Sequence, residues 1–317
     1  MIIHLDQKDW IGLARGYYGV DQRLEKVANQ VVQAADSEKA IFPLSIINLD
    51  ETNKRMEDES RRRLAKFMVR VSKAWAILPA TRIIQPEIED ACVRYLKLPG
   101  YDLRKFAIKK GISQLVGAKG ELVWKNLPPP ELNKILLEKI ESPEAMLMAL
   151  ERGATADQLR REQARAQRGI ERIEEIRKSQ SQIRDNDLRH RAVLAHYVVE
   201  EIAPKVAKFL VDRDLDPRPF FDRFLTKRPE IIRFFKAIPT AYCVTELDFR
   251  RNMLRARKVQ ANDLNDIMSL SIALPYSDVV VTEKMWHTMI VQDKLDKLRP
   301  TRVLTSVMQL APILKTL

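Results

Sequence analysis

Short apolar runs alternate with longer segments of helical spacing at the start of the chain. Residues 1–5 form an apolar run that ends at Asp6, and apolar positions three and four apart follow it. A second apolar run, residues 40–44, leads into a segment that Ser45 or Asn48 can cap as a helix. The order of these segments predicts a strand, a helix, a second strand and a second helix.

A third apolar run continues this alternation. Residues 76–79 and 81–84 predict a strand, and Pro86 stands where a proline commonly begins a helix. Strand and helix thus alternate three times within the first hundred residues. This pattern is typical of a parallel α/β sheet.

The middle of the chain has a different pattern. From about residue 101 to residue 249 no strand is predicted, and apolar residues recur at helical spacing. Residues 157–191 are dominated by charged residues and glutamine, which indicates one long exposed helix with intrahelical ion pairs. We therefore expect a helical insertion domain over residues 101–249.

The α/β pattern returns towards the C-terminus. Residues 262–274 predict a helix, residues 278–282 an apolar strand and residues 302–307 a last strand. We expect the two ends of the chain, residues 1–100 and 250–317, to build one α/β domain around a parallel sheet.

Net charge narrows the class of partner. The sequence contains 55 Lys and Arg residues against 43 Asp and Glu residues, which gives a formal net charge of +12. Such an excess favours a polyanion, so nucleic acid is the expected partner class. The alternative is a basic, solvated surface that binds no ligand.

Composition excludes several other classes of protein. The uncharged apolar stretches are shorter than the roughly 18–20 residues of a membrane-spanning helix, and no signal-peptide pattern opens the chain. A cytoplasmic protein without a membrane partner is therefore expected. Cys92 and Cys243 lie far apart, which excludes a disulfide framework and a cysteine zinc site. No P-loop, nucleophile-elbow or kinase signature occurs.

Acidic residues stand near the ends of the predicted strands or at the start of the helix before the fourth strand. The set is Asp6, Glu51, Asp263, Asp266 and Glu283, with Thr282 beside the last of them. In open parallel sheets functional residues gather at the carboxyl ends of the strands. Clustered carboxylates repel one another, so a site that holds several of them usually contains a hard divalent cation such as Mg²⁺ or Mn²⁺. A basic protein with an acidic centre is what a metal-dependent nuclease requires.

These segments resemble the PIN-domain ribonucleases, a family that includes the PIN-like toxins of bacterial toxin–antitoxin systems. The strand that ends at Asp6 is similar to the family's opening motif, and residues 45–51 are similar to its second motif, which carries a glutamate. Residues 266–273 resemble the helix of the third acid, and residues 278–283 resemble the fourth strand, which ends in a threonine and an acid.

The resemblance implies a three-layer α/β/α fold and a metal-dependent endoribonuclease that acts as a toxin or as a defence-system effector. By resemblance, Asp6, Glu51 and Asp266 would bind Mg²⁺ or Mn²⁺, and Thr282 and Glu283 would be the contribution of the fourth strand. The products would carry a 5′-phosphate and a 3′-hydroxyl. The two ends of the chain carry the resemblance, and the helical insertion has no counterpart in it.

Other readings of these residues stay open. Many family members have an aspartate two positions after the threonine of the fourth strand, and here that position is Lys284. The alternative to an enzyme is therefore a catalytically weak RNA-binding module, or a protein that binds a partner or a second copy through its helical insertion. Asp263, one turn before Asp266, is a further catalytic candidate, and its structural alternative is an acid favoured at a helix start by the helix dipole.

A basic stretch precedes the helix that begins near residue 262. It contains Arg250, Arg251, Arg255, Arg257 and Lys258. The spacing predicts that residues 251, 255 and 258 share one helical face, from which they would contact the phosphates that flank a scissile bond. The alternative is a solvated helix face with no ligand.

Overall fold

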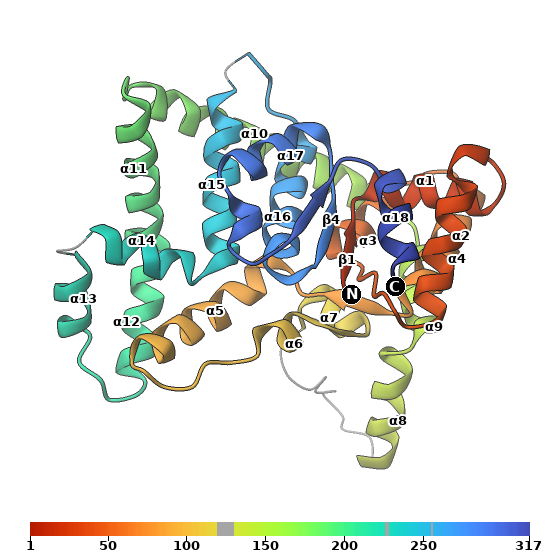
Figure 1. The fold of residues 1–317 in the computed structure, drawn as a ribbon, viewed down its shortest axis with the longest axis horizontal. Helices are drawn as coiled ribbons and strands as arrows, with labels where there is room; N and C mark the ends of the chain where they lie inside the picture. The colour runs from red at the N-terminus through yellow and green to blue at the C-terminus, as the bar shows by residue number, and fades with distance from the viewer. Residues whose placement is uncertain (119–129, 226–227, 255) are drawn as a thin grey trace. The chain divides into compact units, whose positions relative to one another are not determined.

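The structure, a computed structural model, describes residues 1–118, 130–225, 228–254 and 256–317 (Figure 1). The chain divides into two compact units. The first, which we call the sheet unit, comprises residues 1–79, 104–160 and 276–317. The second, which we call the helical unit, comprises residues 80–103 and 161–275.

Three short parallel strands form the centre of the sheet unit. Their order across the sheet is β1 (Ile3–Leu5), β4 (Val279–Val281) and β5 (Arg302–Leu304). In register, Ile3 lies opposite Val279. Every residue of β1 and β4 is buried, as expected for parallel strands that are covered on both faces.

The strand arrangement continues on the far side of β1. Ile2, directly before β1, forms a parallel bridge with Ile41, and Leu44 forms a parallel bridge with β2 (Trp75–Ile77). β2 then pairs in antiparallel orientation with β3 (Ile108–Lys110). The extended segments that follow β1 in sequence therefore lie on one side of it, and β4 and β5 lie on the other side. Such a reversal of strand order is where open α/β sheets bind their ligands.

Helices cover the sheet. Those of the sheet unit are α1 (Gln7–Tyr17), α2 (Gln22–Asp36), α3 (Ile46–Asn53), α4 (Asp58–Ser72), α6 (Leu103–Ala107), α7 (Ile112–Val116), α8 (Pro130–Ile140), α9 (Pro143–Glu151), α17 (Lys284–Gln292) and α18 (Leu310–Lys315), with 3₁₀ turns at Leu295–Lys297 and Val307–Gln309. α1, α2, α4 and α18 lie together beside β1 (Figure 1). Trp10 of α1 meets Phe67 of α4 edge to face, with ring centroids 6.2 Å apart, and both side chains are fully buried.

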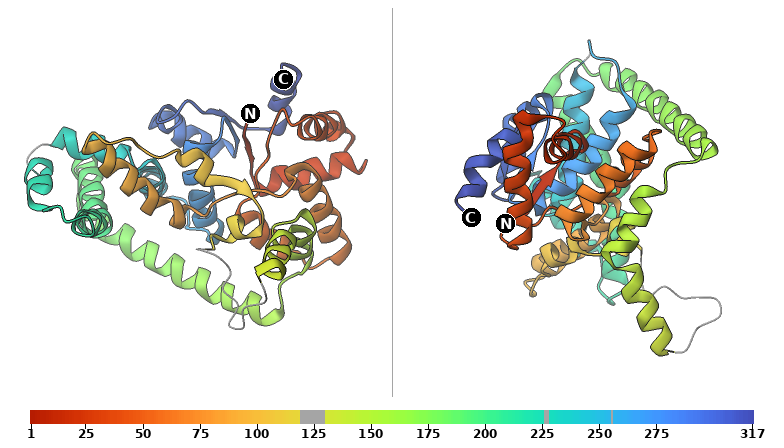
Figure 2. Two further views of the ribbon diagram at one scale, coloured as in Figure 1. Left: turned by 90° about the horizontal axis from the view of Figure 1, so that it is seen from below. Right: turned by 90° about the vertical axis from the view of Figure 1, so that its right-hand side faces the viewer.

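The helical unit contains helices alone among its described residues. They are α5 (Ala80–Tyr95), α10 (Ala156–Ser181), α11 (Asn186–Tyr197), a π-helical turn (Val198–Ile202), α12 (Ala203–Val211), α13 (Arg218–Leu225), α14 (Arg228–Lys236), α15 (Pro239–Met253) and α16 (Ala261–Tyr276). α10, whose first turn belongs to the sheet unit, is one uninterrupted rod (Figure 2). The buried Glu87 carboxylate of α5 accepts hydrogen bonds from the backbone N–H and the hydroxyl of Thr240, at 3.0 and 2.6 Å, and so joins α5 to α15.

Several expected elements are present. Strands form at Ile3–Leu5, Trp75–Ile77, Val279–Val281 and Arg302–Leu304, all within expected segments or one residue from them. The second apolar run contributes single bridges rather than a full strand. Ser45 caps α3 as expected: its hydroxyl accepts from the backbone N–H of Asn48, whose side chain in turn accepts from the backbone N–H of Ser45.

Two expected features of the strand pattern are wrong. Residues 81–84 are helical, because buried positions such as Ala80, Ile83 and Ile88 follow helical spacing and α5 runs through Pro86. A strand also occurs in the middle of the chain, at β3. Only one of its three residues is buried, and the two exposed lysines that follow give no apolar pattern. Charged residues of this kind are typical of an edge strand.

The unit boundaries and the long middle helix also differ from expectation. Residues 104–160 group with the sheet, since β3 pairs with β2 and α9 packs on α4, whereas residues 80–103 and 250–275 group with the helices. The single helix expected over residues 157–191 is two helices, because Asp185 caps a new one by accepting from the backbone N–H of Leu188. No described helix is both long enough and apolar enough to cross a membrane.

Candidate active site

Asp6 lies at the carboxyl end of β1, where it caps α1. Its backbone is extended, with φ −68° and ψ 160°, and its Oδ1 atom accepts a hydrogen bond of 2.6 Å from the backbone N–H of Gln7. Burial raises the pKa of the Asp6 carboxyl, and the N–H of Gln7 and the charge of Lys8 lower it by smaller amounts. The end of β1 therefore carries a poorly hydrated carboxylate.

Asp9 lies one helical turn further along α1. Only 6% of the residue is exposed. The backbone N–H of Asp6 donates to the Asp9 carboxylate, whereas Oδ2 of Asp9 has no hydrogen-bond partner among the described residues. The pKa of Asp9 is raised to about 7, mainly by burial and in smaller part by the nearby charge of Asp6. The carboxyl groups of Asp6 and Asp9 are thus both desolvated and interact electrostatically.

The end of β4 lies beside the end of β1, because Val281 is paired with Leu5. Thr282 is buried and donates its backbone N–H to Leu304 at 2.9 Å, so the strand end is fixed by β5. Glu283 caps α17 and is half exposed, and its carboxylate forms an ion pair of 3.2 Å with Lys8. The charge of Glu283 also raises the pKa of both Asp6 and Asp9, so the three carboxyl groups lie within one another's electrostatic field.

A buried polar network joins α3 to the start of α1. The amide nitrogen of Gln7 donates to Oγ1 of Thr52 at 2.9 Å, and the amide of Asn48 donates to Oε1 of Gln7 at 3.1 Å. Glu51 precedes Thr52 on α3 and is half-buried. The network therefore fixes the helix that carries Glu51 against the helix that Asp6 caps.

Within the described ranges, no group of three or more His, Cys, Asp or Glu side chains is arranged to hold a metal ion. A hard divalent cation does not need such a group, since Mg²⁺ usually keeps several waters and takes one or two carboxylates. The chemistry of the Asp6 and Asp9 carboxyl groups, with one buried oxygen lacking a partner, fits a cation of that kind.

Asp263 and Asp266 belong to the helical unit. Asp263 is buried, forms an ion pair of 2.8 Å with Arg257 and accepts a hydrogen bond of 3.0 Å from the backbone N–H of Gln260, directly before α16. These contacts are those of an acid that stabilises a helix start. Asp266 lies one turn later on α16 and is half-buried.

The basic stretch does not form the expected helical face. α15 ends at Met253, so residues 251 and 258 do not lie on one helix, and residue 255 lies outside the described residues. The Arg251 residue is only 2% exposed and its guanidinium pairs with Asp248 at 2.8 Å. Arg257 pairs with Asp263, Arg250 is half-buried and Lys258 is exposed. Internal ion pairs thus use part of the charge that we expected to meet phosphates.

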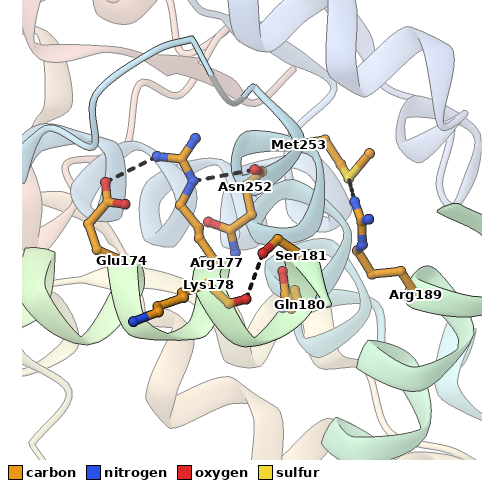
Figure 3. Close-up of a pocket in the computed structure, with 8 residues that line it drawn as sticks. All are labelled: Glu174, Arg177, Lys178, Gln180, Ser181, Arg189, Asn252 and Met253. Atoms are coloured by element: carbon orange, nitrogen blue, oxygen red, sulfur yellow. Dashed lines mark hydrogen bonds and ion pairs between the residues drawn. The ribbon is translucent and has the colours of Figure 1, made fainter. Parts of the chain in front are cut away.

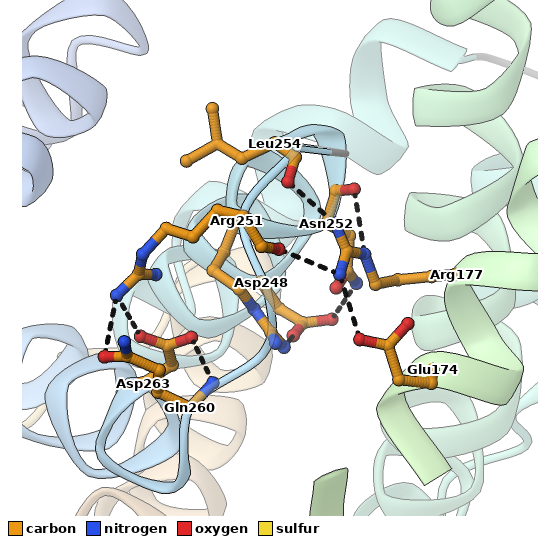
Figure 4. Close-up of polar contacts among 9 residues, drawn as sticks. Glu174, Arg177, Asp248, Arg251, Asn252, Leu254, Gln260 and Asp263 are labelled. Atoms are coloured by element: carbon orange, nitrogen blue, oxygen red, sulfur yellow. Dashed lines mark hydrogen bonds and ion pairs between the residues drawn. The ribbon is translucent and has the colours of Figure 1, made fainter. Parts of the chain in front are cut away.

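Arg177 of α10 holds the end of α15 (Figure 4). Its guanidinium donates to the carbonyl oxygens of Asn252, Leu254 and Arg257, at 3.4, 2.7 and 3.2 Å, and pairs with Glu174 at 3.1 Å. A cation at the last carbonyl groups of a helix is favourable. Arg177 thus supplies hydrogen-bond donors to carbonyl groups at and after the end of α15.

A pocket of about 340 Å³ lies beside this contact (Figure 3). It is lined by Glu174, Arg177, Lys178, Gln180, Ser181, Arg189, Asn252 and Met253. Arg189 donates to the sulfur of Met253 at 3.2 Å and to the carbonyl of Ile183 at 2.9 Å. Both arginines of the pocket are therefore engaged by the protein itself.

Sequence reasoning missed two residues of the site, Asp9 and Gln7. A signal for Asp9 was present, because Asp6 and Asp9 are three positions apart at a helix start and such residues share a face. Gln7 carried no signal, since its importance depends on Thr52 and Asn48, which are far away in sequence.

No family model matches the sequence, and neither the curated proteins nor the solved structures contain a match.

Proposed function

We propose that the chain is a divalent-metal-dependent nuclease that hydrolyses RNA phosphodiester bonds at the carboxyl ends of β1 and β4. The observation that carries the proposal is the gathering of Asp6, Asp9 and Glu283 where the strand order reverses. Strongly desolvated carboxyl groups with raised pKa values are concentrated at functional sites.

The side chains of the site have separate roles in this proposal. A bound Mg²⁺ or Mn²⁺ would supply Lewis-acid polarisation of the scissile phosphate and would lower the pKa of water. Asp6 would hold the cation, and the buried surroundings would strengthen that attraction by excluding water. Lys8, which Glu283 orients, would contact a phosphate oxygen of the substrate strand.

The resemblance to PIN-domain ribonucleases supports RNA as the substrate and a three-layer α/β/α arrangement as the fold. The parallel order of β1, β4 and β5 and the acids that follow the first two strands agree with that resemblance. Glu51 and Asp266 remain proposed as further metal ligands, and a role as toxin or defence effector is proposed on the same basis. The net charge of +12 supports a polyanionic substrate.

A second candidate is an RNA-binding module that cleaves weakly or not at all. The ion pair between Lys8 and Glu283 favours it, because a lysine amine here takes a carboxylate that a metal would otherwise use. Lys284 replaces an acid at the corresponding position of many family members. In this reading the helical unit would bind a protein partner or a second copy.

Cleavage of a substrate panel tests the proposal. The purified chain would be incubated with tRNA, mRNA, single-stranded DNA and double-stranded DNA, in Mg²⁺, in Mn²⁺ and in EDTA. We expect RNA fragments with 5′-phosphate ends in the metal-containing samples alone. Asp6→Asn should abolish cleavage, and Glu51→Gln and Asp266→Asn should each lower it.

Asp36→Asn is the matched control, because Asp36 is an exposed aspartate of the same unit whose ion pair with Arg70 lies at the surface. It should cleave like the parent. RNA binding without cleavage in any metal would favour the second candidate. Equal activity of the parent and Asp6→Asn would exclude this site altogether.

A further inference from the structure

We infer that Asp9 binds the divalent cation directly, so that Asp6 and Asp9 hold it from the cap and the first turn of α1. This inference rests on the proposed function and adds to it. Asp9 does not belong to any of the motifs that carry the resemblance to PIN-domain ribonucleases, so the assignment comes from the structure of this chain.

The position of Asp9 on α1 directs its carboxyl towards Asp6. Side chains of a helix lean towards the helix N-terminus, so a residue in the first turn reaches back over the capping residue. The hydrogen bond from the backbone N–H of Asp6 to the Asp9 carboxylate agrees with that direction. The two carboxyl groups therefore face the same place at the end of β1.

The hydrogen-bond inventory of Asp9 is incomplete. Oδ2 of Asp9 is buried and has no partner among the described residues, although the residue is only 6% exposed. A buried polar atom without a partner is unfavourable, so it calls for an explanation such as a bound ion. A cation between the two carboxyl groups would supply the missing partner and remove their mutual repulsion.

The arrangement also matches what a divalent cation accepts. Two carboxylates with the remaining positions taken by water and by substrate phosphate is a common way to bind Mg²⁺. It explains why no cage of three side chains is needed among the described residues. Glu283 would stay with Lys8, outside the inner set of ligands.

Binding of Mn²⁺ without substrate tests the inference. The free Mn²⁺ signal would be followed by electron paramagnetic resonance for the parent, Asp6→Asn, Asp9→Asn and the control Asp36→Asn. We expect Asp9→Asn to weaken binding by at least the roughly 10–100-fold that loss of an outer-shell partner causes. Asp36→Asn should bind like the parent. An affinity of Asp9→Asn within twofold of the parent would overturn the inference.

A thiol variant tests the same contact with a softer metal. Asp9→Cys should lose affinity for Mn²⁺ and gain affinity for Cd²⁺, with the charge-transfer absorbance of a thiolate bond, because thiolates select soft metals. This variant also serves if Asp9→Asn does not fold. An Asp9→Cys protein that binds Mn²⁺ like the parent and shows no such absorbance would contradict direct ligation.

The two proposals fail in different ways. If the parent binds Mn²⁺ and cleaves RNA while Asp9→Asn binds Mn²⁺ equally well, the role of Asp9 is wrong and the nuclease proposal stands. If the parent neither binds Mn²⁺ nor cleaves RNA, both are wrong.

Discussion

At the scale of single residues, Asp9 places a carboxyl group in surroundings that disfavour its charge. Burial raises its pKa from 3.8 to about 7, and Asp6 adds to that effect. The folded protein therefore holds a proton on Asp9 more tightly than the unfolded chain does. Stability gained from this proton is present at low pH and is lost as the pH rises through about 7.

Asp9→Asn should remove this dependence in the metal-free protein. Above pH 7 the variant should be more stable than the parent, because its amide carries no charge to bury. Between about pH 4 and pH 7 the parent should regain stability relative to the variant as the pH falls, by up to about 1.4 kcal/mol per pH unit. Urea unfolding at several pH values measures the difference, and Asp36→Asn should track the parent throughout. A difference that stays constant with pH would contradict the prediction.

At the scale of secondary-structure elements, the network of Gln7, Asn48 and Thr52 fixes α3 against α1. All three side chains are buried, and they satisfy one another across two helices. A buried donor that loses its acceptor costs more than the hydrogen bond contributed, because it was removed from water on folding. The network therefore controls the position of Glu51 as well as the stability of the sheet unit.

Thr52→Val should destabilise the protein by about 1–3 kcal/mol, because it removes the acceptor of Gln7 and keeps the size of the side chain. Thr288→Val is the matched control, since the Thr288 hydroxyl is exposed and donates only within its own helix. The control should change stability by less than about 0.5 kcal/mol. Chemical denaturation measures both. Equal effects in the two variants would show that the network contributes little.

Arg177→Ala should loosen the end of α15 and destabilise the helical unit by about 1–3 kcal/mol, since hydrogen bonds from a charged group are lost at several carbonyl groups. Lys178→Ala changes the exposed neighbour on the same helix and should be close to neutral. Hydrogen exchange of the last turn of α15 reports the local effect. Exchange that is unchanged in Arg177→Ala would mean that α15 ends independently of α10.

The sequence alone predicts local structure, but it does not predict contacts between distant residues. The strand at Ile3–Leu5 and the helix start at Ser45 could be predicted, because apolar patterning and capping act over a few residues. The pairing of Gln7 with Thr52 could not, since it joins positions 45 residues apart. The sequence does not distinguish Arg251 from an exposed arginine. The fold shows that Arg251 is buried and forms an ion pair with Asp248.

At the scale of the whole molecule, the excess of positive charge governs how the chain meets a polyanion. A net charge of +12 would attract any polyanion at long range, but the ion pairs of Arg251 and Arg257 show that net charge overstates the number of free cations. Exposed lysines such as Lys258 are better placed to contact phosphates. Affinity for RNA should therefore fall with salt less steeply than the charge count suggests.

Lys258→Ala should reduce the slope of log affinity against log salt by about 0.7, the value for one single-strand phosphate contact. Lys26→Ala, which removes an exposed lysine from α2 in the sheet unit, is the comparison variant. Fluorescence anisotropy with a labelled RNA at three salt concentrations gives both slopes. A slope for Lys258→Ala equal to that of the parent would leave the basic stretch without a role in binding.

The central strand pair also sets a condition on synthesis of the protein. The backbone N–H of Ile2 donates to Asp278, a contact that spans 276 positions, and β1 lies beside β4. A ribosome therefore exposes Asp6 long before Glu283. Until β4 is made, β1 lacks its neighbour on that edge and Glu283 cannot join Asp6 and Asp9. An enzyme that degrades RNA at this place would in this way lack part of its site on the messenger from which it is being made until β4 has been translated.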